Sequence, residues 1–227
     1  MPDEQRHVFY ETAADGYANS RAHPWQDRWI AGQSPNGCWL VVADGITGGV
    51  NGHWAAQSAV SVAASALAST DLLEPAVMNA VMAAQAAVAP WFVDAVGGTT
   101  LSIATLTFRR LVACTVGDSP VLADDDGQLR QLSPVLPTGG LRQWIGMQGV
   151  VDPWLDSWAV SGPRVVAVTS DGADGAGVLC GQRSASALVE EILTLHRSAN
   201  GDDSTAAVAR LVLPSASESS RGGSHAY

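Results

Sequence analysis

Positive charge is scarce in this chain of 227 residues, which has 12 Lys and Arg against 22 Asp and Glu and therefore a net charge of −10. A surface of this kind repels phosphate backbones and anionic lipid, which argues against a nucleic-acid-binding or membrane-surface protein. No apolar run approaches the roughly 20 residues that a membrane-spanning helix needs. The polar start of the chain, MPDEQRHVFYET, is not that of a signal peptide. We therefore expect a cytoplasmic protein.

Cysteine is also scarce, and the three cysteines, Cys38, Cys114 and Cys180, are far apart with no Cys-x-x-Cys pair. An odd and sparse set argues against a disulfide framework or a thiolate zinc site. Each cysteine stands in an apolar stretch, so we expect buried free thiols. The chain also lacks a GxSxG motif and a Cys followed by a five-residue, Arg-terminated phosphate loop, so the sequence does not indicate a covalent nucleophile of either kind.

The composition predicts one folded domain. Hydrophobic residues make up 47% of the chain and charged residues 15%, which excludes disorder as the main state and permits a sizeable core. Only the stretch after Leu213, PSASESSRGGSHAY, is rich in Ser and Gly with little to bury. We expect a single domain over residues 1–213 and a disordered tail over residues 214–227.

Apolar periodicity predicts an α+β fold. Asp71 should cap the second helix, with Glu74 completing a capping box, and Asp126-Gly127 should form a hairpin turn. The predicted order lacks the regular strand–helix alternation of a doubly wound fold, and favours helices laid on the outer faces of a sheet or sandwich. The expected elements are a strand at 39–44, helices at 51–69 and 71–89, strands at 99–108, 111–117, 120–125 and 164–171, a helix at 184–196 and a strand at 204–213.

Aspartates stand repeatedly at the ends of the predicted strands. Taken singly, each Asp-Gly pair is also typical of an ordinary turn. Carboxylates that converge at one end of a sheet repel one another unless a cation lies among them, and Mg²⁺ or Mn²⁺ prefers oxygen ligands. The pattern therefore suggests a divalent-cation site. Its members are Asp27 beside WI, Asp44 after LVVA, Asp118 after TVG, Asp171 after AVTS, and Asp203 just before the last strand.

Five segments together resemble the motifs of the metal-dependent Ser/Thr protein phosphatases, the PPM or type 2C family, and particularly its compact bacterial members. VVADGITGGVNGHWAA resembles the family's VxDGMGGxxxGxxAS block, and GGTTLSIATL its GTT strand. LVACTVGDSPVLADDDGQLRQLS is similar to xVGDSRxYLxxxGxLxxLT, VVAVTSDGADG to LLLxSDGLxD, and GDDSTAAVARL to DDNxTxVVVxL. The resemblance runs in the family's order over roughly residues 20–213. It implies a four-layer α/β/β/α sandwich of two mostly antiparallel sheets flanked by helices.

The resemblance also implies a centre of two Mg²⁺ or Mn²⁺ ions. By this likeness Asp44 bridges both ions and the carbonyl oxygen of Gly45 contacts the second ion. Asp171 and Asp203 then bind the first ion.

Three further residues take roles from the same resemblance. Asp27 corresponds to the acidic residue of the family's early NED or NQD motif and helps hold the second ion through water. Asp118 matches an aspartate that shares a third, weaker metal site with Asp171; a turn-stabilising role is the alternative. Arg21, six residues before Asp27, corresponds to the phosphate clamp, with a solvated surface arginine as the alternative and Arg28 as a weaker substitute.

The implied activity is hydrolysis of phosphoserine and phosphothreonine in proteins by metal-activated water, opposing a Ser/Thr kinase, by a monomer. Two alternatives stay open: a non-catalytic, phosphatase-shaped interaction module, and a phosphatase of a non-protein phosphoester. The irregular spacing of Arg21 and the short segment between Ser133 and Arg164, where the family has its flap, motivate the first alternative. Trp144, Trp154 and Trp158 in that segment serve either core packing or an exposed contact surface.

Overall fold

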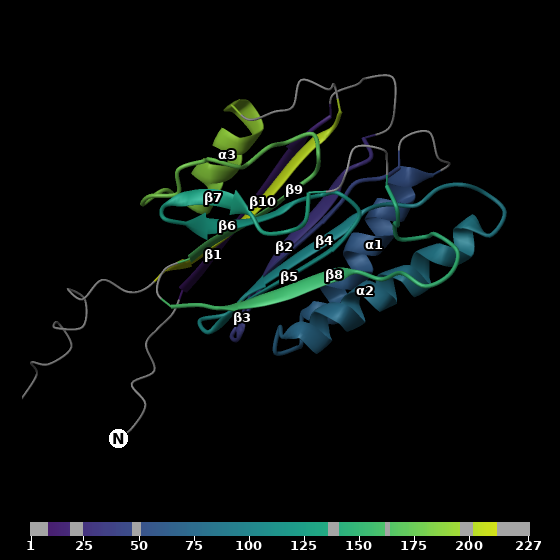
Figure 1. Cartoon of the computed structure of the whole chain (residues 1–227), viewed down its shortest axis with the longest axis horizontal. Helices are drawn as coiled ribbons and strands as arrows, with labels where there is room; N and C mark the ends of the chain where they lie inside the picture. The colour runs from purple at the N-terminus through teal and green to yellow at the C-terminus, as the bar shows by residue number, and fades with distance from the viewer. Residues whose placement is uncertain are drawn as a thin grey trace, which may run out of the picture.

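Two antiparallel five-stranded sheets stack face to face in the computed structural model, which describes residues 9–18, 25–46, 51–135, 141–161, 164–195 and 202–212 (Figure 1). The first sheet has the order β1-β10-β9-β6-β7, and the second has the order β2-β3-β4-β5-β8. The strands are β1 (Phe9–Tyr17), β2 (Arg28–Ser34), β3 (Gly37–Ala43), β4 (Leu101–Leu106), β5 (Arg110–Val116), β6 (Val121–Asp125), β7 (Gln128–Gln131), β8 (Trp154–Ala159), β9 (Arg164–Thr169) and β10 (Ser204–Val212).

Helices cover the outer faces of both sheets. Helix α1 (Gly52–Leu67) and helix α2 (Glu74–Val88) pack on the second sheet, and the 3₁₀ helix η1 (Ala89–Phe92) continues α2. Helix α3 (Ala185–Leu195) packs on β1 and β10 of the first sheet. This arrangement confirms the predicted four-layer α/β/β/α sandwich.

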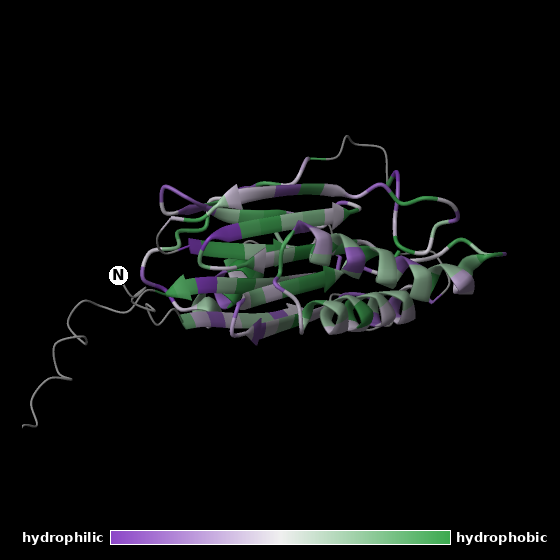
Figure 2. Cartoon of the chain, turned by 90° about the horizontal axis from the view of Figure 1, so that it is seen from below, coloured by the Kyte–Doolittle hydropathy of each residue, from purple (hydrophilic) through white to green (hydrophobic). Residues whose placement is uncertain are grey.

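Each interface between layers has its own apolar core, and Figure 2 shows the strands as largely hydrophobic. Strand β3 is buried along its whole length, because Val41 faces the helices while Leu40 and Val42 face the other sheet. Burial on both faces explains why its sequence is a continuous apolar run rather than an alternating one.

Strands β1, β2 and β8 are not among those predicted from the sequence, whereas β7 completes the predicted Asp126-Gly127 hairpin. Strand β1 has the sequence FYETAADGY, whose Ala, Asp and Gly have low strand propensity, and it pairs with β10 along its full length. Strand β8 lies within the segment that the resemblance assigned to the flap, and it pairs with β5 from Thr115↔Trp154 onwards. Long-range pairing of this kind leaves little signal in local sequence.

The predicted capping box at Asp71 is wrong. Helix α2 begins at Glu74 after the N-cap residue Leu73, and no side chain caps it. Leu72 is fully buried, has a φ of 60°, and its carbonyl accepts a 2.7 Å hydrogen bond from the Thr105 hydroxyl. Burial of Leu72 in the core beneath the helices therefore keeps the chain non-helical at the residues where the box would form.

Other sequence predictions are confirmed. Residues Asp126 and Gly127 both have positive φ, 52° and 83°, and join β6 to β7 as the hairpin turn. All three cysteines are free and buried. Among the described residues, none of the helices combines the length and the apolar character that crossing a bilayer requires. The predicted tail over residues 214–227 lies outside the described residues.

Candidate metal centre

Antiparallel pairing gathers the strand-end aspartates at one end of the sandwich. The pair Arg28↔Ala43 joins the start of β2 to the end of β3, which places Asp27 next to Asp44 in the second sheet. In the first sheet, the pair Ala206↔Thr169 joins the start of β10 to the end of β9. It places the residues before β10 next to the turn that contains Asp171. A 2.8 Å hydrogen bond from the backbone amide of Gln26 to the Asp203 carboxylate links the two sheets at this end.

Two threonines immediately before β4 fix the backbone of Asp44. The Thr99 hydroxyl and the Thr100 amide each donate a 2.8 Å hydrogen bond to the Asp44 carbonyl, and the Asp44 amide donates to the Thr100 hydroxyl at 2.9 Å. The Thr100 hydroxyl also lies 2.8 Å from the Ser119 hydroxyl. Thr100 therefore connects Asp44 to the turn that contains Asp118. The sequence resemblance identified this strand but gave its threonines no role.

Close backbone contacts require the glycine of both Asp-Gly pairs. A Cβ atom on Gly45 would lie 2.6 Å from the carbonyl oxygen of Gly52. A Cβ atom on Gly172 would lie only 1.8 Å from the carbonyl oxygen of Asp203. These glycines let two segments approach closely beside each aspartate, which is a different role from that of the Asp126-Gly127 hairpin.

Asp27 is a buried carboxylate that forms no ion pair with a cation among the described residues. Its exposed fraction is 0%, and neither side-chain oxygen has hydrogen-bond geometry to another described residue. Burial raises the pKa of Asp27 to about 6, against the opposing effect of the nearby Ser170 and Thr205 hydroxyls. A carboxylate in this state is stabilised most by an adjacent cation.

The negative charge of neighbouring aspartates adds to this effect at Asp44. Burial is the largest cause that raises the pKa of Asp44 well above its ordinary value, and the charges of Asp27 and Asp171 follow. Burial also raises the pKa of Asp171, followed by the charges of Asp118 and Asp202. The aspartates from both sheets are thus within electrostatic reach of one another.

The two consecutive aspartates before β10 act on different parts of this group. The charge of Asp202 raises the pKa of Asp44, Asp118 and Asp171. The Asp203 carboxylate accepts the hydrogen bond from Gln26, and its charge acts on Asp27. Sequence reasoning selected Asp203 as the ligand and gave Asp202 no role. The Asp-Asp pair was the available signal, but consecutive residues near a strand point to opposite sides, so the pair alone does not decide between them.

The donor set fits a hard divalent cation. Within the described ranges, no three His, Cys, Asp or Glu side chains form a ready-made coordination group. Mg²⁺ and Mn²⁺ accept carboxylates spread around them because they retain several water ligands. Mutually repelling carboxylates, one of them buried without a cationic partner among the described residues, are the arrangement that such an ion stabilises.

The predicted phosphate clamp Arg21 lies outside the described residues. Arg28, its weaker substitute, donates hydrogen bonds to the carbonyl oxygens of Trp25 at 2.7 Å and Asp27 at 2.6 Å. With these contacts Arg28 stabilises the turn that positions Asp27.

Comparison with solved structures finds close matches of fold. A serine/threonine phosphatase from S. agalactiae superposes with a TM-score of 0.73 at 19% identity, covering 88% of this chain and 99% of that chain. The PPM phosphatase MsPP from Mycobacterium smegmatis, in complex with cacodylate, gives 0.69 at 20% identity, covering 89% and 98%. The catalytic domain of PstP, solved with two manganese ions, gives 0.69 at 23% identity, covering 90% and 99%. At these identities the likeness is one of fold.

Sequence comparison gives the family directly. No curated protein sequence matches the chain. The family model described as "Protein phosphatase 2C" matches residues 17–136, a stretch that includes Asp27, Asp44, the two threonines and Asp118. With the family match and the shared fold together, the chain belongs to the protein phosphatase 2C family.

Proposed function

We propose that this protein is a Mg²⁺- or Mn²⁺-dependent phosphatase that hydrolyses phosphoserine and phosphothreonine in proteins. The observation that carries the proposal is the buried carboxylate of Asp27, which has no cationic partner among the described residues and lies beside Asp44, where the ends of the two sheets meet. Family membership supports phosphoester hydrolysis. Structural neighbours described as serine/threonine phosphatases support protein substrates.

The proposed ligand set draws on both sheets. Asp44 would hold both ions, and Asp27 and the Gly45 carbonyl would help to hold one of them. Asp171 and Asp203 would hold the other ion, and Asp118 would share a third ion with Asp171. The Asp203 carboxylate also accepts the hydrogen bond from the backbone amide of Gln26, next to Asp27.

Bound divalent ions supply a water of lowered pKa and neutralise charge on the phosphoryl oxygens. The chain's own residues hold the carboxylates in fixed positions. Thr99 and Thr100 fix the backbone of Asp44, and burial excludes water from Asp27. The Ser204 hydroxyl donates a 2.8 Å hydrogen bond to the Gly172 carbonyl, which ties the Asp171 turn to β10. Fixed ligands of this kind reduce the reorganisation needed during reaction.

The biological setting follows from the same proposal. The substrate is a phosphoprotein, and the opposing enzyme is a Ser/Thr kinase. The net charge of −10 supports a cytoplasmic monomer that binds neither nucleic acid nor membrane.

The test measures turnover of p-nitrophenyl phosphate and of phosphoserine and phosphothreonine peptides with added Mn²⁺ or Mg²⁺. Activity should require the ion and disappear with a chelator. The double variant Asp44→Asn plus Asp171→Asn should lose activity. The matched control Asp126→Asn, in the exposed β6–β7 turn, should keep it.

Preserved turnover in the double variant would refute metal-dependent catalysis. A folded wild-type protein that neither binds Mn²⁺ nor turns over any phosphoester would instead favour the non-catalytic interaction module. Turnover of small phosphoesters without any turnover of phosphopeptides would favour a non-protein substrate.

A further inference from the structure

A small cavity of about 100 Å³ opens next to the turn that carries Asp118. Gly117, the residue before Asp118, lies in its wall, and Arg142 supplies its positive charge. Its volume suits a small group rather than a large one. The lining residues are Thr115, Gly117, Pro134, Arg142, Gln143 and Trp154.

Arg142 differs from the other arginines in the described part of the chain. The chain has no lysine, so arginine supplies every permanent positive side chain. Arg142 is exposed and makes no hydrogen bond, ion pair or ring contact with the residues that the structure describes. Every other described arginine makes at least one such contact: Arg28, Arg109, Arg110, Arg130, Arg164, Arg183 and Arg210.

The backbone after Arg142 is fixed relative to the metal centre. Thr99 and Ile145 exchange backbone hydrogen bonds of 3.0 and 2.8 Å. The same Thr99 donates its hydroxyl to the Asp44 carbonyl. Gln143, adjacent to Arg142, donates to the Asp152 carbonyl at 2.6 Å and accepts from its amide at 2.8 Å. Arg142 therefore begins a segment that is anchored to the residue holding Asp44.

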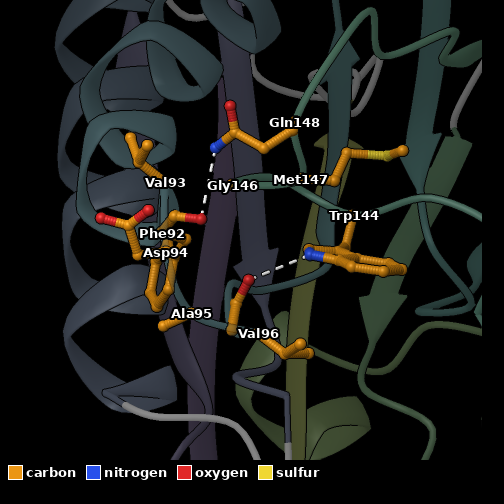
Figure 3. A pocket seen from close by; sticks show the side chains of 10 residues that line it. Phe92, Val93, Asp94, Ala95, Val96, Trp144, Gly146, Met147 and Gln148 are labelled. Carbon is orange, nitrogen blue, oxygen red and sulfur yellow. Dashed lines mark hydrogen bonds between the residues drawn. The ribbon is translucent and has the colours of Figure 1, made fainter.

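Side chains further along hold this segment from its other side. Figure 3 shows a second, separate pocket on this other side, where the Trp144 indole donates to the Gly97 carbonyl, at 3.0 Å, and the Gln148 amide donates to the Phe92 carbonyl, at 3.3 Å. Gln85 in α2 accepts from the Gly146 amide at 2.8 Å. These contacts fix the backbone that directly follows Arg142.

We infer that Arg142 binds the phosphoryl group of the substrate directly, next to the metal centre. This inference rests on the proposed function. The surrounding aspartates offset the positive charge of two divalent cations, so the centre has no net positive charge left to bind a phosphate dianion. The phosphate therefore needs a further cation. A guanidinium offers paired N–H donors that match phosphate oxygens. Arg142 has these donors unoccupied among the described residues, at a cavity that adjoins Asp118.

The test compares Arg142→Ala and Arg142→Lys with the control Arg130→Ala, which removes an exposed arginine of the β6–β7 hairpin. The measurements are KM and kcat for p-nitrophenyl phosphate and a phosphothreonine peptide, and the inhibition constant of inorganic phosphate. Calorimetry of phosphate binding to the Mn²⁺-loaded protein gives a readout independent of turnover. Circular dichroism verifies folding of each variant.

We expect Arg142→Ala to raise both KM values and the phosphate inhibition constant about 10- to 100-fold, with kcat changed by less than about threefold. Arg142→Lys should fall between the wild type and the alanine variant, because it keeps the charge but loses the paired donors. Arg130→Ala should match the wild type.

Equal values for Arg142→Ala and Arg130→Ala would overturn the inference. A rise in KM for the peptide alone, with phosphate binding unchanged, would also overturn it and would assign Arg142 to a peptide carboxylate. If the wild type turns over no phosphoester, the proposed function fails. Calorimetry then still tests the inference. Weaker phosphate binding by Arg142→Ala than by the wild type would support it, and equal phosphate binding would overturn it.

Discussion

The buried carboxylate of Asp27 contributes to the pH dependence of stability in the metal-free protein. Its pKa in the fold is about 6, against an ordinary value of 3.8, so the folded protein keeps this proton to a higher pH than the unfolded chain does. The stabilisation of the fold by protonated Asp27 is therefore fully present below pH 3.8, and it is lost as the pH rises through about 6. A difference of this size corresponds to about 3 kcal/mol.

We therefore predict that the free energy of unfolding of the chelator-treated wild type falls more steeply between about pH 4 and about pH 6 than that of Asp27→Asn. Urea denaturation at each pH measures this difference. Saturating Mn²⁺ should restore the wild type's stability at the higher pH, because the bound ion favours the ionised carboxylate. Parallel pH profiles for the two metal-free proteins would contradict the prediction.

The adjacent residues Asp202 and Asp203 should respond differently to the same substitution. Asp203→Asn removes the charge of the assigned ligand, so Mn²⁺ affinity should fall at least about tenfold. Asp202→Asn removes a charge from a neighbour that is not assigned as a ligand, so its affinity should stay closer to that of the wild type. Calorimetric titration with Mn²⁺ ranks the variants, and the opposite ranking would assign the ligand to Asp202.

At the scale of the elements, Gly172 fixes how closely the turn after β9 approaches the start of β10. An added Cβ atom would overlap the Asp203 carbonyl, which is backbone and cannot rotate away. Gly172→Ala should therefore destabilise the protein by about 1–3 kcal/mol. The matched control Gly175→Ala meets only side-chain atoms at 3.5 Å or more and should cost less. Chemical denaturation compares them, and equal losses would show that the turn can relax.

The strands buried on both faces could be predicted from sequence, whereas those defined by pairing could not. Strand β3 is a continuous apolar run, and the Asp126-Gly127 turn has its own local chemistry. Strand β1 consists largely of residues that disfavour strands, and it is held by its register with β10. The start of α2 was mispredicted because burial of Leu72 overrides the local capping preference of Asp71.

The same distinction applies to the candidate site. Aspartates at strand ends could be predicted from their spacing, because apolar runs mark where strands stop. The proximity of Asp27 to Asp44 follows from the β2–β3 register, and the link between sheets follows from one hydrogen bond of Gln26. Neither the choice between Asp202 and Asp203 nor the role of Thr100 has a local sequence signal, since both depend on side-chain direction in the folded chain.

At the scale of the whole molecule, the two sheets meet at one end with an excess of negative charge that only cations can offset. The central claim is that this end holds a pair of divalent ions around Asp44. Anomalous scattering from crystals grown with Mn²⁺ tests it most directly, by counting the ions and identifying their ligands. We predict two strong peaks bridged by the Asp44 carboxylate, with Asp171 on one ion and the Gly45 carbonyl on the other. Crystals of Mn²⁺-saturated protein with no anomalous peak within coordination distance of Asp44 would contradict the claim.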